Sequence, residues 1–349
     1  MSLKQITEPL LEWYRNNARD LPWRRSHDPY RIWVSEIMLQ QTRVAAVIGY
    51  YDRFLTAFPN VYELASASEE HLMKLWEGLG YYSRARNLQK AARTIVADYD
   101  GNFPDTYEQL LTLSGVGEYT AGAIASAAFG HKVAAVDGNV LRVISRLLEN
   151  DEDIGDTKTK RSYKIMLEGA LPNSVEDMRI FNQAMMELGA TVCVPNGAPK
   201  CDMCPVRAYC KAYSNGTMEK FPVKTPKKAR RIERKTVFVL LREGQVALRK
   251  RGDNGLLAGL YEFPNVGAVL SEQEVYAYLE ASGLRIVDWK KQLHGKHIFT
   301  HIEWDMTGYV LQVVGNGTDD LIWADQMEFS SYAIPSAFSK FTKEALALL

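Results

Sequence analysis

Residues 113–130, LSGVGEYTAGAIASAAFG, predict the end of one helix, a tight glycine turn and a second helix rich in alanine and glycine. Gly115 and Gly117 permit a close approach of the backbone to a ligand. The second helix begins with free N–H groups that point outward, and such a helix start binds a phosphate without reading a base sequence. Taken alone, the same residues fit an ordinary corner between two helices equally well.

The residues on either side of this turn predict an all-α domain. From residue 5 to about 215 the apolar residues recur at helical spacing. In FPDTYEQLLTLSG, residues 103–115, Thr106 and Gln109 form a capping box that starts a helix, and Gly115 is expected to end it. The buried face of this helix is expected to contain Leu110, Leu111 and Leu113.

The pattern changes after residue 215. Residues 211–235 contain six Lys and three Arg against two Glu, and residues 221–235 have two prolines and little to bury, which indicates a basic linker. Beyond it, 235–241 and 245–251 predict a β-hairpin, 275–283 a helix and 302–314 a strand pair. We therefore expect a helical domain over 1–215, a linker over 216–235 and an α+β domain over 236–349.

The bulk composition excludes several classes of protein. The chain has 349 residues, 46% of them hydrophobic and 24% charged, with zero formal net charge. Its first residues lack the apolar run of a signal peptide, and its longest apolar stretches are too short to span a bilayer. We expect a cytoplasmic, monomeric protein that keeps its thiols reduced and does not bind a membrane.

All the cysteines lie within one stretch of eighteen residues, CVPNGAPKCDMCPVRAYC, residues 193–210. The gaps between successive cysteines are seven, two and five residues, and one CxxC clip without a second is unusual for zinc. Four thiolates in one compact loop suit an iron–sulfur cubane. The alternatives are structural zinc and core cysteines without a ligand. The ligands of either metal site are Cys193, Cys201, Cys204 and Cys210.

Two carboxylates lie in apolar surroundings. Glu36 occurs in RIWVSEIMLQQTRV, where burial is expected to raise its pKa, and Asp137 occurs in AAVDGNVLRV, at the start of a helix. An N-cap role is the simple explanation for Asp137. A protonated acid and an ionised carboxylate that face one substrate are the groups used to cleave a glycosidic bond.

The order of these motifs resembles that of the MutY-type adenine DNA glycosylases, which belong to the helix-hairpin-helix, iron–sulfur superfamily. The resemblance extends over nearly the whole chain and rests on LPWRRSHDPYRIWVSEIMLQQTRV, GLGYYSRARNL, LSGVGEYTAGAI, VDGNVLRV, FNQAMMELGA, the cysteine loop and GLYEFP. It implies one [4Fe-4S] cluster, binding to double-stranded DNA with A:8-oxoguanine or A:G mispairs, and excision of the adenine. In a bacterium such a protein is associated with the nucleoid.

The resemblance also implies residue roles. Glu36 matches the general acid that protonates adenine N7, and Asp137 matches the carboxylate that stabilises or captures the sugar cation. Residues that position these two are Tyr119 and Asn139. The pocket around the extruded adenine is implied to contain Trp23, Arg24, Leu39 and Gln183. Contacts to the duplex are implied for Gln41, Thr42, Tyr81, Gly115 and Gly117, with Gln41 and Tyr81 as the wedge.

Tyr119 decides the subclass. Related endonuclease III-like enzymes have a lysine at this position, and its amine forms a Schiff base with the sugar. A phenol cannot do so, and we therefore expect a monofunctional glycosylase. The alternatives are an endonuclease III-like pyrimidine-damage glycosylase and a non-catalytic iron–sulfur DNA-binding regulator.

The C-terminal domain resembles a Nudix fold with a recognition role. Its helix retains only Glu280 of the paired glutamates that would hold magnesium. Phe299, Thr300 and His301 resemble the family's Phe-Ser-His loop, which senses 8-oxoguanine, with Thr in place of Ser. A strand end that faces solvent is the simpler explanation of these residues. The first cysteine gap is one residue longer than is usual in the family, and a bulge is expected at 196–199.

Overall fold

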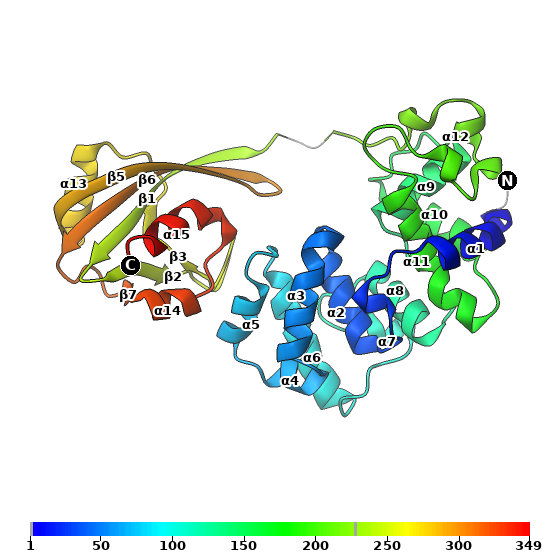
Figure 1. The fold of residues 1–349 in the computed structure, drawn as a ribbon, viewed down its shortest axis with the longest axis horizontal. Coiled ribbons are helices and arrows are strands. Elements are labelled where there is room, and N and C mark those ends of the chain that lie inside the picture. The colour runs from blue at the N-terminus through cyan, green and yellow to red at the C-terminus, as the bar shows by residue number, and fades with distance from the viewer. Residues whose placement is uncertain (1–2, 227–228) are drawn as a thin grey trace. The chain divides into compact units, whose positions relative to one another are not determined.

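The computed structural model describes residues 3–226 and 229–349. Its packing divides the chain into two units, one made of Met1–Ser66 and Arg86–Pro226, the other of Ala67–Ala85 and Lys227–Leu349. The first unit is helical and the second contains a mixed sheet (Figure 1). The expected combination of an all-α and an α+β domain is confirmed. No helix among the described residues is long and apolar enough to cross a membrane.

The helical unit is built around a long central helix. This helix, α11 (Val175–Thr191), starts at Ser174, whose side chain accepts a hydrogen bond from the Asp177 N–H. Its apolar face, which includes Phe181 and Met185, is buried in the core of the unit. The other helices are α1 (Thr7–Asn17), α2 (Pro29–Leu39), α3 (Val44–Ala57), α4 (Val61–Ser66), most of α6 (Ser83–Asp98), α7 (Tyr107–Leu110), α8 (Glu118–Phe129), α9 (Gly138–Leu148), α10 (Thr157–Glu168) and α12 (Lys211–Ser214).

The helix before the glycine turn is shorter than expected. The capping box of Thr106 and Gln109 is present, but α7 ends at Leu110 and not at Gly115, which lies in the following turn with a φ of 77°. Leu110 and Leu113 are buried, as expected, whereas Leu111 is 37% exposed. Leu111 is the C-cap of α7, beyond its last helical residue, and Leu113 is buried from the turn that follows.

Within the described residues of the second unit, seven strands form one sheet in the order β3-β2-β1-β6-β5, with β4 paired to β1 and β7 to β2. The central strands β1 and β6 are parallel, and the other pairs are antiparallel. The bounds are β1 (Arg231–Arg242), β2 (Gln245–Lys250), β3 (Tyr261–Glu262), β4 (Asn265–Val266), β5 (Arg285–Ile298), β6 (Ile302–Val314) and β7 (Ile322–Ala324).

Two sequence expectations for this sheet need correction. Residues 302–314 form the single strand β6 and not a strand pair, and its partner is β5. Strand β5 has mostly exposed, polar residues, and apolar alternation therefore did not indicate it. The sheet also begins early, because β1 pairs with β6 from Arg231 onward, inside the segment expected as the linker over 216–235. Residues 227–228 of that segment lie outside the described residues.

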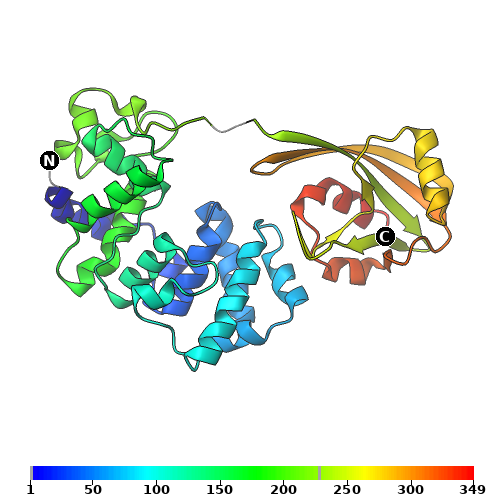
Figure 2. The ribbon, with the colours of Figure 1, turned by 180° about the vertical axis from the view of Figure 1, so that it is seen from behind.

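Helices cover both faces of the sheet (Figure 2). Phe238 and Leu240 of β1 pack toward α13 (Glu272–Ala281), while Val237 and Val239 pack toward α14 (Gln326–Ser331) and α15 (Ser339–Leu346). Successive side chains of a strand point to opposite faces, and an unbroken apolar run such as TVFVLL is typical of a strand buried on both sides. The unit also contains α5 (Glu69–Trp76).

Candidate active site

Four sequence motifs that lie far apart in the chain meet at one pocket of the helical unit. The pocket has an empty volume of about 1760 Å³, including space open to solvent. Glu36 reaches it from α2, Tyr119 from α8, Asp137 from the start of α9 and Gln183 from α11. Acidic, phenolic and amide groups therefore share one cavity large enough for an extruded nucleobase.

The surroundings of Glu36 favour its protonated form. The Tyr119 hydroxyl donates a hydrogen bond of 2.8 Å to Glu36 Oε2. Burial raises the pKa of Glu36 to about 7, assisted by the nearby charge of Asp137 and opposed by the Tyr119 hydrogen bond. The sequence-based expectation of a raised pKa agrees with this geometry.

Asp137 is held in a different way. Its side chain caps α9 by accepting from the Val140 N–H at 2.8 Å, and it also accepts from Asn139 Nδ2 at 2.7 Å. Burial raises the pKa of Asp137 above its usual value, and these donors partly offset the effect. The N-cap role and a role in the pocket therefore belong to the same carboxylate.

The asparagine beside Asp137 is itself fixed by a buried arginine. Arg142 Nη2 donates to Asn139 Oδ1 and to Gly189 O, each at 2.8 Å, and Arg142 Nε donates to Cys193 O at 2.8 Å. One guanidinium therefore joins the Asp137 neighbourhood to the start of the cysteine loop.

The residues expected around a base all line this pocket: Trp23, Arg24, Leu39 and Gln183. Trp23 is largely buried and packs edge-on against Tyr51. The Tyr14 hydroxyl donates to Gln183 Oε1 at 2.7 Å, which directs the amide.

Two further pocket residues were missed by the sequence analysis. The Glu187 side chain is fully buried and forms ion pairs with Arg19 at 2.7 Å and Arg24 at 2.8 Å. Burial acts to raise the pKa of Glu187, but hydrogen bonds from the two arginines lower it to about 2. The sequence could have indicated Glu187, because it lies four residues after Gln183 and therefore on the same face of α11. No sequence pattern indicated Arg19, because its partner lies 168 residues away.

Gln41 and Thr42 line the same pocket where the chain leaves α2, and Gln41 has a φ of 57°.

The glycine turn joins two helices, as expected. Gly115 has a positive φ, and Gly117 is the N-cap of α8, where no side chain of the described residues caps the helix. The first N–H groups of α8 therefore remain available to a phosphate.

Tyr81 belongs to the second unit and is 46% exposed, with a φ of 46°. Its hydroxyl lies 2.8 Å from Thr300 Oγ1. Phe299, Thr300 and His301 form the turn between β5 and β6, closed by a hydrogen bond from Phe299 N to Ile302 O. His301 is exposed.

The turn is anchored by an aromatic contact. Phe299 packs edge-on against Trp304, at 4.9 Å between ring centroids. Arg230 Nε donates to Phe299 O at 3.1 Å. These contacts fix Phe299, the residue that precedes Thr300 and His301.

Glu280 is exposed on α13.

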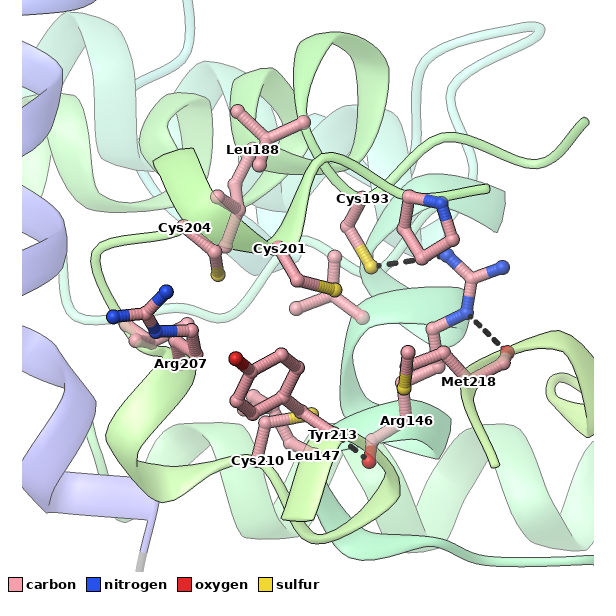
Figure 3. A pocket seen from close by; sticks show the side chains of 14 residues that line it. Arg146, Leu147, Leu188, Cys193, Cys201, Cys204, Arg207, Cys210, Tyr213 and Met218 are labelled. Carbon is pink, nitrogen blue, oxygen red and sulfur yellow. Dashed lines mark hydrogen bonds between the residues drawn. The ribbon is translucent and has the colours of Figure 1, made fainter. Parts of the chain in front are cut away.

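The cysteines surround a common pocket with an empty volume of about 400 Å³ (Figure 3). Apolar residues such as Leu147 and Leu188 form part of its lining. Arg146 Nη1 donates to Cys193 Sγ at 3.2 Å, and Arg207 lies at the other side. Positive charge beside thiolates and an apolar wall suit a buried anionic metal–thiolate group. The residues that would hold it are Cys193, Cys201, Cys204 and Cys210.

Across residues 3–226 and 229–349, no group of three or more His, Cys, Asp or Glu side chains is arranged to hold a metal ion.

Comparison with protein families identifies both units. Residues 34–168 match the model described as HhH-GPD superfamily base excision DNA repair protein, and residues 236–344 match the NUDIX domain. Adenine DNA glycosylases are similar over most of the chain: the human protein is 36% identical over 95% of this chain and 72% of its own length. The protein of Buchnera aphidicola (Acyrthosiphon pisum) is 33% identical over 85% of this chain and 83% of its own.

Solved structures agree for the helical unit. A thermostable thymine-DNA glycosylase superposes with a TM-score of 0.56 at 30% identity and covers 61% of this chain and 97% of its own. Endonuclease III in a non-covalent DNA complex gives a TM-score of 0.52 at 25% identity and covers 62% and 98%.

The fold and the pocket define a base-excision DNA glycosylase of the helix-hairpin-helix class with a Nudix-type C-terminal domain. Within that class, the chain belongs to the adenine DNA glycosylase family, whose enzymes hydrolyse N-glycosyl bonds. The resemblance inferred from the sequence is confirmed.

Proposed function

We propose that this protein removes adenine mispaired with 8-oxoguanine or guanine from double-stranded DNA, and leaves the backbone intact. The observation that carries this proposal is that Glu36 and Asp137 line one pocket, in which the Tyr119 hydroxyl donates a hydrogen bond to Glu36. A protonated and an ionised carboxyl group are the pair that glycosidic hydrolysis requires.

Each carboxyl group has a distinct part in the reaction. Glu36, with a pKa of about 7, donates a proton to adenine N7 and turns the base into a leaving group. Asp137, whose N–H donors favour its ionised form against the effect of burial, stabilises the positive charge that develops on the sugar, and water completes the hydrolysis. Tyr119 keeps Glu36 in place and has no amine to form a Schiff base.

The adenine must leave the base stack before this chemistry, because Glu36 and Asp137 lie inside a pocket that a base stacked in a duplex cannot enter. Trp23 and Leu39 provide apolar surface for the extruded base, and Arg24 and Gln183 provide polar contacts. The salt bridges of Glu187 hold Arg24 in the pocket wall. Gln41 and Tyr81 fill the gap in the duplex, and Thr42 contacts the strand nearby.

The duplex is held through its phosphates. Gly115 and Gly117 let the backbone at the start of α8 approach a phosphate closely, and the basic segment over 211–235 adds sequence-independent attraction. Phe299, Thr300 and His301 sense the oxidised base, because a hydroxyl can both donate to and accept from the N7–H and O8 edge of 8-oxoguanine.

The cysteine pocket holds one [4Fe-4S] cluster in this proposal. It would join the two ends of the loop over 193–210 through the four cysteines, next to Leu147 of α9 and Leu188 of α11, which line the pocket. Its part is structural: it stabilises the surface next to the DNA.

A single gel assay tests the function. Labelled duplexes with A opposite 8-oxoguanine, A opposite guanine and a normal A:T pair are incubated with the protein, with and without alkali. We expect strand breaks after alkali only, fastest opposite 8-oxoguanine and absent at A:T. Asp137→Asn, a nearly isosteric change, should bind the same duplexes without excision.

Three outcomes would contradict the proposal. Strand breaks without alkali, or efficient borohydride trapping of the unmutated protein on DNA, would indicate the lyase chemistry of the endonuclease III class. Binding without excision would leave a DNA-binding regulator.

A further inference from the structure

The segment that carries Asp137 has no helix or strand of its own. Residues 130–137 run from the end of α8 to the start of α9 without regular secondary structure. A free backbone residue retains about 1–2 kcal/mol of conformational entropy. Asp137 is held on its C-terminal side by the N-cap hydrogen bonds of α9, and the backbone that leads to it is ordered only if other groups bind it.

One side chain, the amide of Asn182 on α11, binds this backbone at two points. Its Oδ1 accepts from the Ala135 N–H at 3.1 Å, and its Nδ2 donates to Val133 O at 2.8 Å. The amide therefore pairs with a C=O and with an N–H two residues later, as the peptide group of a neighbouring strand does. Asn182 is 1% exposed, and its Nδ2 also donates to Ser126 Oγ of α8 at 2.9 Å.

Helix α8 supports the segment from the other side. A Cβ added at Gly122 would lie 3.0 Å from Ala134 O, a tighter contact than nearly all real Cβ atoms make. The backbone of the segment therefore rests directly on α8. At its start, the His131 N–H donates to Ala125 O at 3.0 Å. Asn182 of α11 binds the segment as well, at Ala135, two residues before Asp137.

We propose that Asn182 is a positioning residue for Asp137: it acts as a substitute strand that holds residues 133–135 and so aims the carboxylate at the sugar. The inference rests on the proposed function for the role of Asp137. Asn182 does not itself take part in the chemistry. Its neighbour Gln183 faces the base, and the two adjacent positions on α11 therefore have separate tasks.

Asn182→Ala removes the hydrogen bonds to the Ala135 N–H and to Val133 O. We expect the single-turnover rate of adenine excision to fall on the order of 10- to 100-fold, because catalysis is that sensitive to misplacement of a reacting group by about 1 Å. Affinity for the duplex should stay within about twofold, because the change leaves the glycine turn intact. A looser segment also weakens the N–H bonds that lower the pKa of Asp137, and the acidic limb of the pH profile should move to higher pH.

Asn182→Asp is the nearly isosteric companion and distinguishes positioning from packing. A neutral carboxyl accepts from the Ala135 N–H and donates to Val133 O, whereas an ionised one cannot donate. The rate ratio of Asn182→Asp to Asn182→Ala should therefore be several-fold above one at low pH and fall toward one as pH rises. The titration of Glu36 is common to both variants and cancels in this ratio, whereas the titration of Asp137 is taken from the acidic limb of each variant's own pH profile.

Thr7→Val is the matched control. It removes a buried 2.7 Å hydrogen bond from a side chain to Ala170 O in the same unit, away from the pocket. It should lower the melting temperature without changing the excision rate or the pH profile. If Thr7→Val and Asn182→Ala lower the rate in proportion to their loss of stability, Asn182 is only a structural residue and the inference is wrong.

Hydrogen exchange provides a readout that needs no substrate. In the unmutated protein the Ala135 amide should be protected like the amides of the core helices, and exchange over 131–137 should rise in either variant. A freely exchanging Ala135 amide would overturn the inference even if both variants failed to fold. Absence of adenine excision by the unmutated protein would overturn the proposed function, whereas normal excision by Asn182→Ala would overturn only this inference.

Discussion

Glu36 and Asp137 face one pocket but receive different hydrogen-bond donors. Asp137 accepts from the backbone N–H of Val140 and from Asn139, which favour its ionised form. Glu36 accepts from the Tyr119 hydroxyl, and burial outweighs that bond, with the result that its pKa rises to about 7. Burial raises the pKa of both carboxyl groups, and the N–H donors of Asp137 oppose this rise, a difference that separates the proposed acid from the proposed carboxylate.

The pH dependence of excision should follow from this separation. Because Glu36 acts in its protonated form, the single-turnover rate should fall as pH rises through about 7, by tenfold per unit well above it. Single-turnover rates between pH 5 and 9 provide the measurement. A rate that continues to rise up to pH 9 would show that Glu36 is not the proton donor.

The same raised pKa should limit stability. The folded protein holds the Glu36 proton up to about pH 7, whereas an unfolded chain loses it near pH 4.5, and stability therefore falls as pH rises between these values. Glu36→Gln removes this effect together with the proton donor. We expect it to lose about 10²–10⁴-fold in rate. Its melting temperature relative to the unmutated protein should increase from pH 5 to pH 8, and a difference that is constant with pH would contradict the prediction.

At the scale of the element, the two glycines of the hairpin have different reasons to be glycine. Gly115 has a φ of 77°, and a Cβ there would lie 2.8 Å from the Asn87 Cβ. Gly117 has extended backbone, and a Cβ there meets nothing within 4 Å. Glycine at 115 is therefore required by the backbone of the turn, whereas glycine at 117 leaves the space in front of the first N–H groups of α8 open.

A pair of alanine substitutions separates these two roles. Gly115→Ala should cost about 1–2 kcal/mol of stability, because of its left-handed backbone. Gly117→Ala should change stability by less than about 0.5 kcal/mol, yet weaken DNA binding, because its methyl group comes between the helix start and a phosphate. Thermal unfolding and fluorescence anisotropy on an undamaged duplex are the measurements. Equal stability losses in both variants would refute this division.

The cysteine loop should contain iron. Anaerobically purified protein should carry about four irons and four sulfides per chain and absorb in the visible range. Cys201→Ser should reduce the iron content and weaken DNA binding, whereas Met203→Ser, an exposed change within the CxxC clip, should do neither. Stoichiometric zinc without iron would identify the site as a structural zinc site.

At the scale of the whole molecule, the proposed chemistry and the proposed lesion sensing belong to separate units. The pocket that contains Glu36 and Asp137 is built entirely from the helical unit, and the turn over 299–301 belongs to the unit that contains the sheet. Such a division lets the identity of the opposite base be read without changing the excision chemistry.

The double variant Thr300→Ala with His301→Ala tests this division. It should lose on the order of 1–3 kcal/mol of discrimination between 8-oxoguanine and guanine. Excision opposite guanine should change less, because Glu36 and Asp137 are intact. The ratio of excision rates on the two duplexes is the measurement, and Ser330→Ala, on α14 of the same unit, is a surface control. An unchanged ratio would remove the turn from lesion recognition.

Local sequence signals predicted much of the fold. The capping box at Thr106, the N-cap role of Asp137 and the hairpin of β1 and β2 each depend on a few neighbouring residues. Strand β5 was missed and β6 was misjudged, because pairing between strands, and not the alternation of apolar residues, defines their length. The early start of β1 at Arg231 has the same cause.

The sequence by itself determined the two-domain class, the family, the clustered thiols and the set of motifs, because these depend on residue type and spacing. Only the tertiary structure decided which side chains meet. Arg19 and Glu187 lie 168 residues apart and pair in the pocket wall, and Asn182 reaches a backbone segment 47 residues away. The apolar neighbours of Glu36 in the sequence indicated its burial and raised pKa, but the opposing Tyr119 hydroxyl and the nearby charge of Asp137 act through space and no local pattern encodes them.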